Sequence, residues 1–168
     1  TLIAKKVREQ ISVNMGIVTT EWDRIPLCKE MDTLNIPIDV DGFDAGVAVN
    51  IGNPHIVFFG KSIENVNLNE VGPKIEQHHF FPNKTNVEFI EVVNSNKIKM
   101  KVWERGAGIT LACGSGACAA VYAGWKKKLI EKNSEVQLEK GSLQISIINN
   151  EAIMTGPAEI SYNGYIHI

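Results

Sequence analysis

Cys113 is the residue whose neighbours in the sequence most favour chemistry. It precedes Gly114-Ser115-Gly116 and a run of small apolar residues, so we expect it at the N-terminal end of a helix. Unpaired amides and the positive end of the helix dipole stabilise a thiolate there and lower its pKa. The same amides bind a carboxylate or phosphate, and the glycines allow close approach of a ligand. The sequence therefore predicts a reactive thiolate beside an anion-binding site.

The alternative for any isolated cysteine is a small residue of the core. That alternative describes Cys118, which lies inside the same apolar run, and Cys28 has no glycine neighbours and is expected to be inert. A metal site on Cys113 and Cys118 would need further ligands, and the dense source of them is His78-His79. We therefore expect no metal.

Other polar residues could serve the same site. Glu104 and Arg105 follow a strand that leads into the cysteine segment, so this strand end delivers both to one edge of the site. Their side chains point to opposite faces, and without the neighbouring cysteine segment they would be explained as a surface ion pair. Asn53 and His55 lie at a turn, and Asn86 precedes a strand. Each of these three, taken alone, is explained as a structural residue.

A buried helix and a sheet are expected to position these residues. The segment 115–129 carries almost no charge before Lys126, so it presents no face to water and other elements must enclose it. We expect an α/β protein in which a strongly curved mixed β-sheet wraps around this central buried helix. A shorter helix with Asn69 as its N-cap is expected before Pro82.

Alternating or β-rich segments between turn residues predict the strands of the sheet. The expected strands are 10–15, 45–51, 55–59, 87–93, 98–103, 136–138, 143–147, 152–155 and 160–168. Between residues 22 and 44, Pro26 and Pro37 interrupt any long element, so this stretch is expected to be a connection.

The composition limits the class of protein. The chain has 168 residues, of which 44% are hydrophobic and 21% charged, as in ordinary globular domains. A formal net charge of -2 provides no basic surface for nucleic acid or for an anionic membrane. Three cysteines do not make a disulfide framework, and no stretch resembles a signal peptide or a membrane span. We expect a cytoplasmic protein that binds neither nucleic acid nor membrane.

Four segments together carry a resemblance to a known family. They read VNIGNPHIVFF, FPNKTNVEFIEV, VWERGAGITLACGSGACAA and MTGPAEISYNG, in this order along the chain. They resemble the C-terminal half of diaminopimelate epimerases, and the Cys-Gly-Ser-Gly helix entrance with its preceding Glu-Arg-Gly is the most specific part. The resemblance implies the fold of that family and an isomerase that interconverts LL- and meso-diaminopimelate. It also implies a role in lysine and peptidoglycan precursor synthesis, without pyridoxal phosphate, metal or another cofactor.

In this family two cysteines face the α-carbon of the substrate from opposite sides, and one removes a proton while the other donates one. The resemblance implies that Cys113 is the second of these cysteines and that His55 and Glu104 support the thiols as catalytic residues. The implied substrate-binding residues are Asn53, Asn86 and Arg105 for the far end of diaminopimelate, the amides of Gly114 and Ser115 for the α-carboxylate, and Glu104.

The family's N-terminal half, with its first cysteine in a Cys-Gly-Asn-Gly type of motif, has no counterpart here. We expect residues 1–13 to be a remnant of the N-terminal domain and residues 14–157 to form the C-terminal domain. Residues 158–168 are expected to be a closing strand that packs toward the N-terminal domain, which leaves apolar surface exposed in this chain. The start at Thr1 rather than at methionine suggests a fragment. The chain alone is expected to be incomplete for catalysis, and the full-length protein is expected to be a homodimer.

Two other functions stay open. One is a cofactor-independent racemase of another amino acid, such as proline, although Glu104-Arg105 with Asn53 and Asn86 favours a substrate with two charged ends. The other is a catalytically inactive fragment that binds a carboxylate or supports a partner subunit. The missing first cysteine is the best argument for that function.

Overall fold

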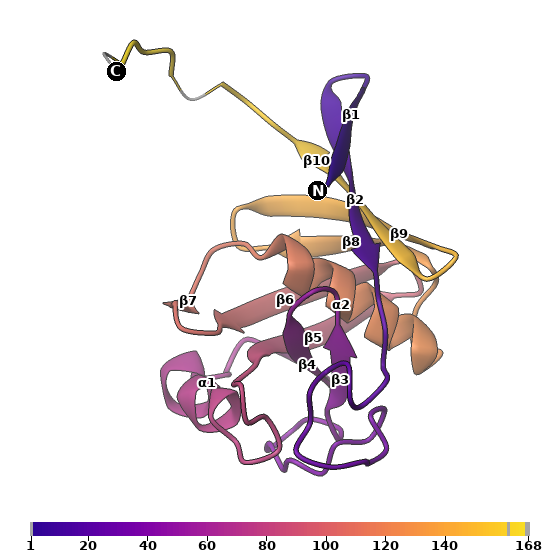
Figure 1. The fold of residues 1–168 in the computed structure, drawn as a ribbon, viewed down its shortest axis with the longest axis vertical. Coiled ribbons are helices and arrows are strands. Elements are labelled where there is room, and N and C mark those ends of the chain that lie inside the picture. The colour runs from indigo at the N-terminus through magenta and orange to yellow at the C-terminus, as the bar shows by residue number, and fades with distance from the viewer. Residues whose placement is uncertain (1, 161, 167–168) are drawn as a thin grey trace.

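The computed structural model describes residues 2–160 and 162–166, which form a ten-stranded mixed sheet with two helices (Figure 1). The strands are β1 (Ile3–Val7), β2 (Gln10–Ile17), β3 (Val47–Asn50), β4 (Pro54–Gly60), β5 (Asn86–Asn94), β6 (Lys97–Glu104), β7 (Gly108–Ile109), β8 (Asn133–Leu138), β9 (Gly141–Ile148) and β10 (Glu151–Pro157). The helices are α1 (Leu68–Glu76) and α2 (Gly114–Lys126). The strand order is β1-β2-β10-β9-β8-β6-β5-β4-β3, and β7 pairs with β6 off this path.

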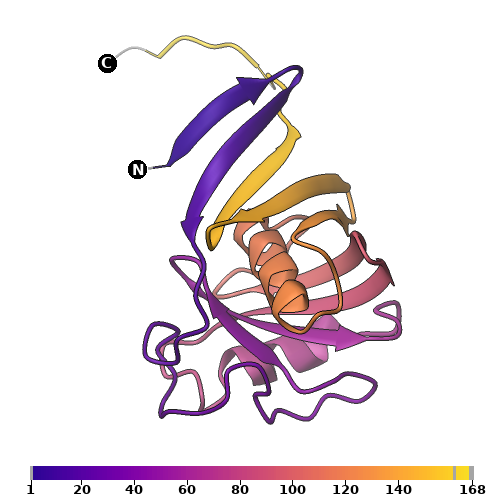
Figure 2. The ribbon, with the colours of Figure 1, turned by 90° about the vertical axis from the view of Figure 1, so that its right-hand side faces the viewer.

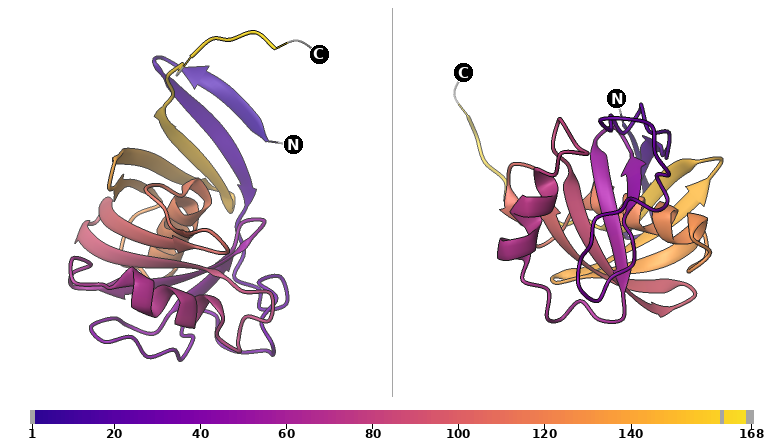
Figure 3. Two further views of the ribbon diagram at one scale, coloured as in Figure 1. Left: turned by 90° about the vertical axis from the view of Figure 1, so that its left-hand side faces the viewer. Right: turned by 90° about the horizontal axis from the view of Figure 1, so that it is seen from below.

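Two βαβ units place the helices on opposite faces of the sheet. β4 runs parallel to β5 after α1, and β6 runs parallel to β8 after α2, whereas β5 and β6 are antiparallel. β6 and β8 therefore run opposite to β4 and β5. Because βαβ crossovers are right-handed, this reversal of direction places α2 on the face of the sheet opposite to α1. The right-hand view of Figure 3, from below, shows α1 and α2 on the two sides of the sheet.

α2 is buried because nearly all its residues are small and uncharged. Its buried residues run without interruption from Gly116 to Gly124. The helix packs against β3, β4, β5, β8, β9 and β10, where Val49, Val57 and Ile90 belong to its core. Figure 2 shows α2 lying across these strands. The prediction of a mixed sheet with a central buried helix is confirmed.

The opposite face of the sheet has a second core. Because strand residues alternate, Val57 of β4 faces α2 while Ile56 and Phe58 face the other side. There they pack with Ile75 of α1 and with Ile36 of the connection. As predicted, the connection contains short extended pieces in the form of isolated bridges, and none of them lengthens into a strand. α1 and the connection cover this face over β3 to β6, and the sheet stays open, so the prediction of a strongly curved sheet is wrong.

The sequence does not predict β1, which forms the edge of the sheet and is exposed along its whole length. β1 and β2 extend past the end of α2 (Figure 2), and Ile3 and Val7 of β1 expose apolar side chains. Residues 158–160 and 162–166 form no strand, so the predicted strand over 160–168 is wrong for them. The rest of that prediction falls on residues 161, 167 and 168, which lie outside the described residues.

The two helices differ slightly from their predicted bounds. α1 begins at Leu68 with Asn67 as its N-cap, so Asn69 lies in the first turn rather than before it. α2 ends at Lys126, three residues before the predicted end at Leu129. In the part of the chain that the structure describes, neither helix is long and apolar enough to span a bilayer.

Candidate active site

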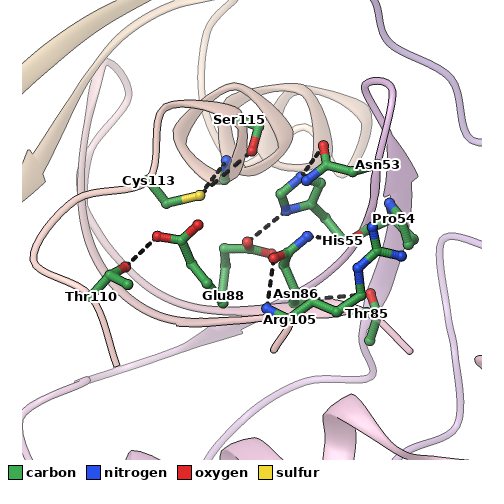
Figure 4. Close-up of polar contacts among 12 residues, drawn as sticks. Asn53, Pro54, His55, Thr85, Asn86, Glu88, Arg105, Thr110, Cys113 and Ser115 are labelled. Atoms are coloured by element: carbon green, nitrogen blue, oxygen red, sulfur yellow. Dashed lines mark hydrogen bonds and ion pairs between the residues drawn. The ribbon is translucent and has the colours of Figure 1, made fainter. Parts of the chain in front are cut away.

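The candidate active site lies where β4, β5 and β6 approach the N-terminal end of α2 (Figure 4). His55 comes from β4, Asn86 and Glu88 from β5, and Glu104 from the end of β6. His55 pairs with Asn86 across the two parallel strands, and Glu88 pairs with Val102 of β6. Because alternate strand residues share a face, His55, Glu88 and Glu104 all lie on the face that α2 covers.

Cys113 is the N-cap of α2, at the predicted helix entrance. Its backbone is extended, so Sγ turns back to accept the N–H of Gly116 at 3.3 Å, and Oγ of Ser115 lies 3.5 Å from the sulfur. Cys113 is only 5% exposed. The N–H groups of Gly114 and Ser115 belong to the same first turn, where no earlier turn supplies an acceptor. The thiol and the expected carboxylate-binding amides therefore lie together.

The protonation state of Cys113 differs from the prediction, because its pKa is raised to about 11. Burial is the largest cause, and the negative charge of Glu88 adds to it. The hydrogen bonds from Ser115 and Gly116 lower the pKa, and the charge of Glu104 raises it further. The prediction of a lowered pKa is wrong because the loss of water and the charges of Glu88 and Glu104 outweigh the hydrogen bonds from Ser115 and Gly116. Cys113 is a thiol at neutral pH and can act as a proton donor.

Glu88 is a residue of the site that sequence reasoning missed. Its Oε1 lies 2.7 Å from Nδ1 of His55, and both side chains are fully buried. Its Oε2 has no hydrogen-bond partner among the described residues. Burial raises the pKa of the Glu88 carboxyl, and His55 opposes this shift. A signal exists in the sequence, because Glu88 shares the strand alternation of the buried Ile90 and therefore occupies an inward position.

Two asparagines and an arginine form a polar edge of the site. Oδ1 of Asn53 lies 3.1 Å from Nε2 of His55. Asn86 donates from Nδ2 to a carbonyl oxygen of β4 at 2.8 Å and accepts the backbone N–H of Arg105 at 2.9 Å. The exposed Arg105 donates from its guanidinium to the carbonyl of Asn83 at 3.1 Å. The structure thus brings these predicted site residues together.

The loop between β6 and α2 is held from two sides. Thr110 donates from Oγ1 to Oε1 of Glu104 at 2.5 Å. From α1, the buried Glu76 accepts the N–H of Gly106 at 3.1 Å on Oε1 and the Nε1–H of Trp103 at 2.7 Å on Oε2. These contacts fix the chain direction on both sides of Glu104.

The remaining cysteines occupy different surroundings. Cys118 is fully buried inside α2, where burial raises its pKa to about 12, and Cys28 is exposed on the connection. The buried position of Cys118 agrees with the predicted packing role, and Cys28 is a surface residue. The rings of His78 and His79 lie with their centroids 4.3 Å apart and their planes tilted by 36°. Within residues 2–160 and 162–166, no group of three or more His, Cys, Asp or Glu side chains could hold a metal ion.

Related proteins share both the sequence and the fold of this chain. A family model described as diaminopimelate epimerase matches residues 47–161. The diaminopimelate epimerase of Pelagibacter ubique is 44% identical over 153 residues, which cover 88% of this chain and 56% of that protein. That of Carboxydothermus hydrogenoformans is 46% identical over 156 residues, covering 92% and 57%. The chain therefore spans little more than half the length of these curated relatives.

Solved structures share the fold at low identity. A phenazine biosynthesis protein of the PhzF family from Enterococcus faecalis has a TM-score of 0.60 and 14% identity, covering 98% of this chain and 60% of that one. A hydroxyproline epimerase from Agrobacterium vitis has a TM-score of 0.58 and 10% identity, covering 93% and 53%. The sequence match, with Cys113 at the entrance of α2, shows that this chain belongs to the diaminopimelate epimerase family.

Proposed function

We propose that this chain supplies the C-terminal part of the active site of a diaminopimelate epimerase. That enzyme interconverts LL- and meso-diaminopimelate for lysine and peptidoglycan precursor synthesis and needs no cofactor. The observation that carries this proposal is the Cys113 thiol at the N-terminal end of α2, with carboxylate-binding amides in the same turn. Asn53, Asn86 and Arg105 recognise the charged far end of the substrate.

Cys113 acts from one face of the α-carbon. As a thiol it donates its proton to the carbon while a base on the opposite face removes the original α-proton. The thiolate left behind is stabilised by the N–H of Gly116 and by the positive end of α2. In the reverse direction this thiolate takes the α-proton. The amides of Gly114 and Ser115 hold the α-carboxylate and stabilise the negative charge that develops as the proton leaves.

Inversion needs a second base, which we assign to the part of the relatives' length that this chain does not cover. Cys118 is enclosed in α2 and Cys28 is exposed on the connection, so neither faces Cys113 across a substrate. On this proposal residues 1–13 belong to the N-terminal domain, 14–157 form the C-terminal domain, and 158–168 pack toward the N-terminal domain. The exposed side chains of Ile3, Ile160 and Tyr162 support this packing.

An epimerisation assay tests the function. The intact protein is incubated with LL-diaminopimelate, and the stereoisomers are separated on a chiral column. We expect conversion to the meso form by the intact protein, no racemisation of L-proline, and no inversion by the 168-residue chain alone. No conversion of diaminopimelate, or conversion of proline in its place, would overturn the proposal.

The same proposal includes a cytoplasmic location and a homodimer of the intact protein. The exposed edge strand β1 supports an additional contact with another polypeptide, because its backbone groups on one side are unpaired by the sheet. Light scattering after gel filtration measures the mass of the intact protein. A monomeric mass at micromolar concentration would contradict the dimer.

A further inference from the structure

Glu88 is a buried ionisable residue to which the proposed reaction gives no role. Both it and His55 are fully buried, and the second carboxyl oxygen of Glu88 has no partner among the described residues. A carboxylate in such surroundings is costly unless a proton or a counter-charge accompanies it. His55, with Nδ1 2.7 Å from Oε1, is the group that can provide either.

The contacts of His55 place one proton between the two side chains. Asn53 presents Oδ1 to Nε2 of His55, and because an amide oxygen only accepts, Nε2 carries a hydrogen. Nδ1 and Oε1 of Glu88 are then joined by one further proton, which lies on the ring or on the carboxyl. Either arrangement leaves the pair with no net charge, which suits complete burial. Loss of this proton in basic solution makes the pair singly negative.

The Glu88 carboxyl of the pair lies close to the thiol. A Cβ added to Gly116 would lie 2.8 Å from Oε1 of Glu88 and 3.2 Å from Sγ of Cys113. The carboxyl and the sulfur therefore both lie next to Gly116, on the side where it has no side chain. The titratable groups that face Glu88 are His55 of β4, Glu104 of β6 and Cys113 of α2. A negative charge on Glu88 therefore opposes a second negative charge on the sulfur.

We propose that Glu88 is a positioning residue that favours the thiol form of Cys113, and that it does so more strongly as the proton it shares with His55 is lost. This role deepens the proposed function and rests on it, because the thiol is the proton donor of that reaction. Burial raises the pKa of both Glu88 and Cys113, and the negative charge of Glu88 raises that of Cys113 further, which agrees with the proposed role. The hydrogen bond to Glu88 also holds the His55 ring in one orientation.

The pH dependence of thiol alkylation tests the role. The intact protein and its Glu88→Gln variant are treated with iodoacetamide, and alkylation of Cys113 is measured by peptide mass spectrometry. Glutamine keeps the size of the side chain but cannot become negative. At about pH 9 we expect alkylation of the variant to be about 3–10-fold faster, since one pKa unit changes the thiolate fraction tenfold while a less basic thiolate reacts more slowly. The ratio should grow from neutral to basic pH.

A matched control is Glu91→Gln, on the same strand, where the carboxylate bonds Lys99 at 2.9 Å and is not a cause of the Cys113 shift. We expect it to alkylate at the unmodified rate. Equal or slower alkylation of Glu88→Gln would overturn the proposal, and so would a ratio that does not change with pH, because simple loosening exposes the thiol at every pH. Should Glu88→Gln fail to fold, Glu88→Met removes the same charge and must give the same result. Alkylation needs no substrate, so this outcome is independent of whether the protein epimerises diaminopimelate.

Discussion

Replacing Gly116 with alanine tests how closely α2 packs on the site. A Cβ there would lie 2.8 Å from Oε1 and 3.3 Å from Cγ of Glu88, and 3.2 Å from Sγ of Cys113. Neither neighbour can retreat freely. Glu88 is fully buried and bonded to His55, and the sulfur accepts the N–H of Gly116 itself. The substitution therefore forces a buried carboxyl or the thiol out of position.

The expected loss of stability is the difference between two opposing effects. Extra atoms in a well-packed interior cost about 1–3 kcal/mol. Alanine in place of glycine stabilises a helix by up to about 1 kcal/mol. Because neither neighbour can move freely, the cost lies in the upper part of its range, about 2–3 kcal/mol, and the net destabilisation is about 1–2 kcal/mol, which lowers the Tm by about 2–8 °C for a protein of this size.

Thermal unfolding followed by circular dichroism measures this change, with Gly114→Ala as the matched control in the same helical turn. A Cβ at position 114 would meet Met154, whose Sδ lies 2.8 Å away at the flexible end of its side chain. We expect that control to stay within about 0.5 kcal/mol of the unmodified protein. A Gly116→Ala variant that melts at or above the temperature of Gly114→Ala would refute the packing argument.

Three further predictions follow from the same contacts. Asn86→Ala removes the acceptor of the Arg105 N–H and a donor to β4, so the free energy of unfolding in urea should fall by about 1–3 kcal/mol; no measurable loss would contradict it. The pKa of Cys113 is about 11 against an ordinary value of 9.0, so the unfolded chain ionises first, and stability falls above pH 9. The loss of stability reaches about 2–3 kcal/mol once the thiol is ionised in the unfolded chain and not in the folded one. Urea unfolding between about pH 9 and 10.5 should show this loss in the unmodified protein and not in Cys113→Ala. The same pH dependence in both proteins would contradict this prediction. Cys28→Ser changes an exposed residue and should leave the rate of epimerisation unchanged in the chiral assay, and a large loss would show that Cys28 has a role.

Local signals were sufficient to predict α2 and the place of Cys113. The small, uncharged residues from Gly116 to Gly124 demand burial whatever surrounds them, and the glycines mark the helix entrance. The strands of the core were also predicted from local signals, because they are alternating or β-rich segments that stand between turn residues. β1 was not predicted, since all of its residues are exposed and its apolar side chains have no core to face.

The electrostatics of the site could not be predicted from local pattern. Glu88 and His55 are 33 residues apart and meet only because β4 and β5 are neighbours in the sheet. The pKa of Cys113 is raised by burial and by the charges of Glu88 and Glu104, so the helix dipole alone predicts the wrong direction. The curvature of the sheet was also beyond local reasoning, because it depends on α1 and the connection covering the second face.

Isotope exchange at the α-carbon of diaminopimelate shows directly whether Cys113 transfers a proton there. The intact protein and its Cys113→Ala variant are incubated with LL-diaminopimelate in deuterium oxide, and the loss of the α-proton signal and the stereoisomers formed are followed by NMR. We expect deuterium in the inverted product of the unmodified protein and no inverted product from Cys113→Ala. Inversion by Cys113→Ala at the unmodified rate would contradict the assignment of Cys113 as the proton donor.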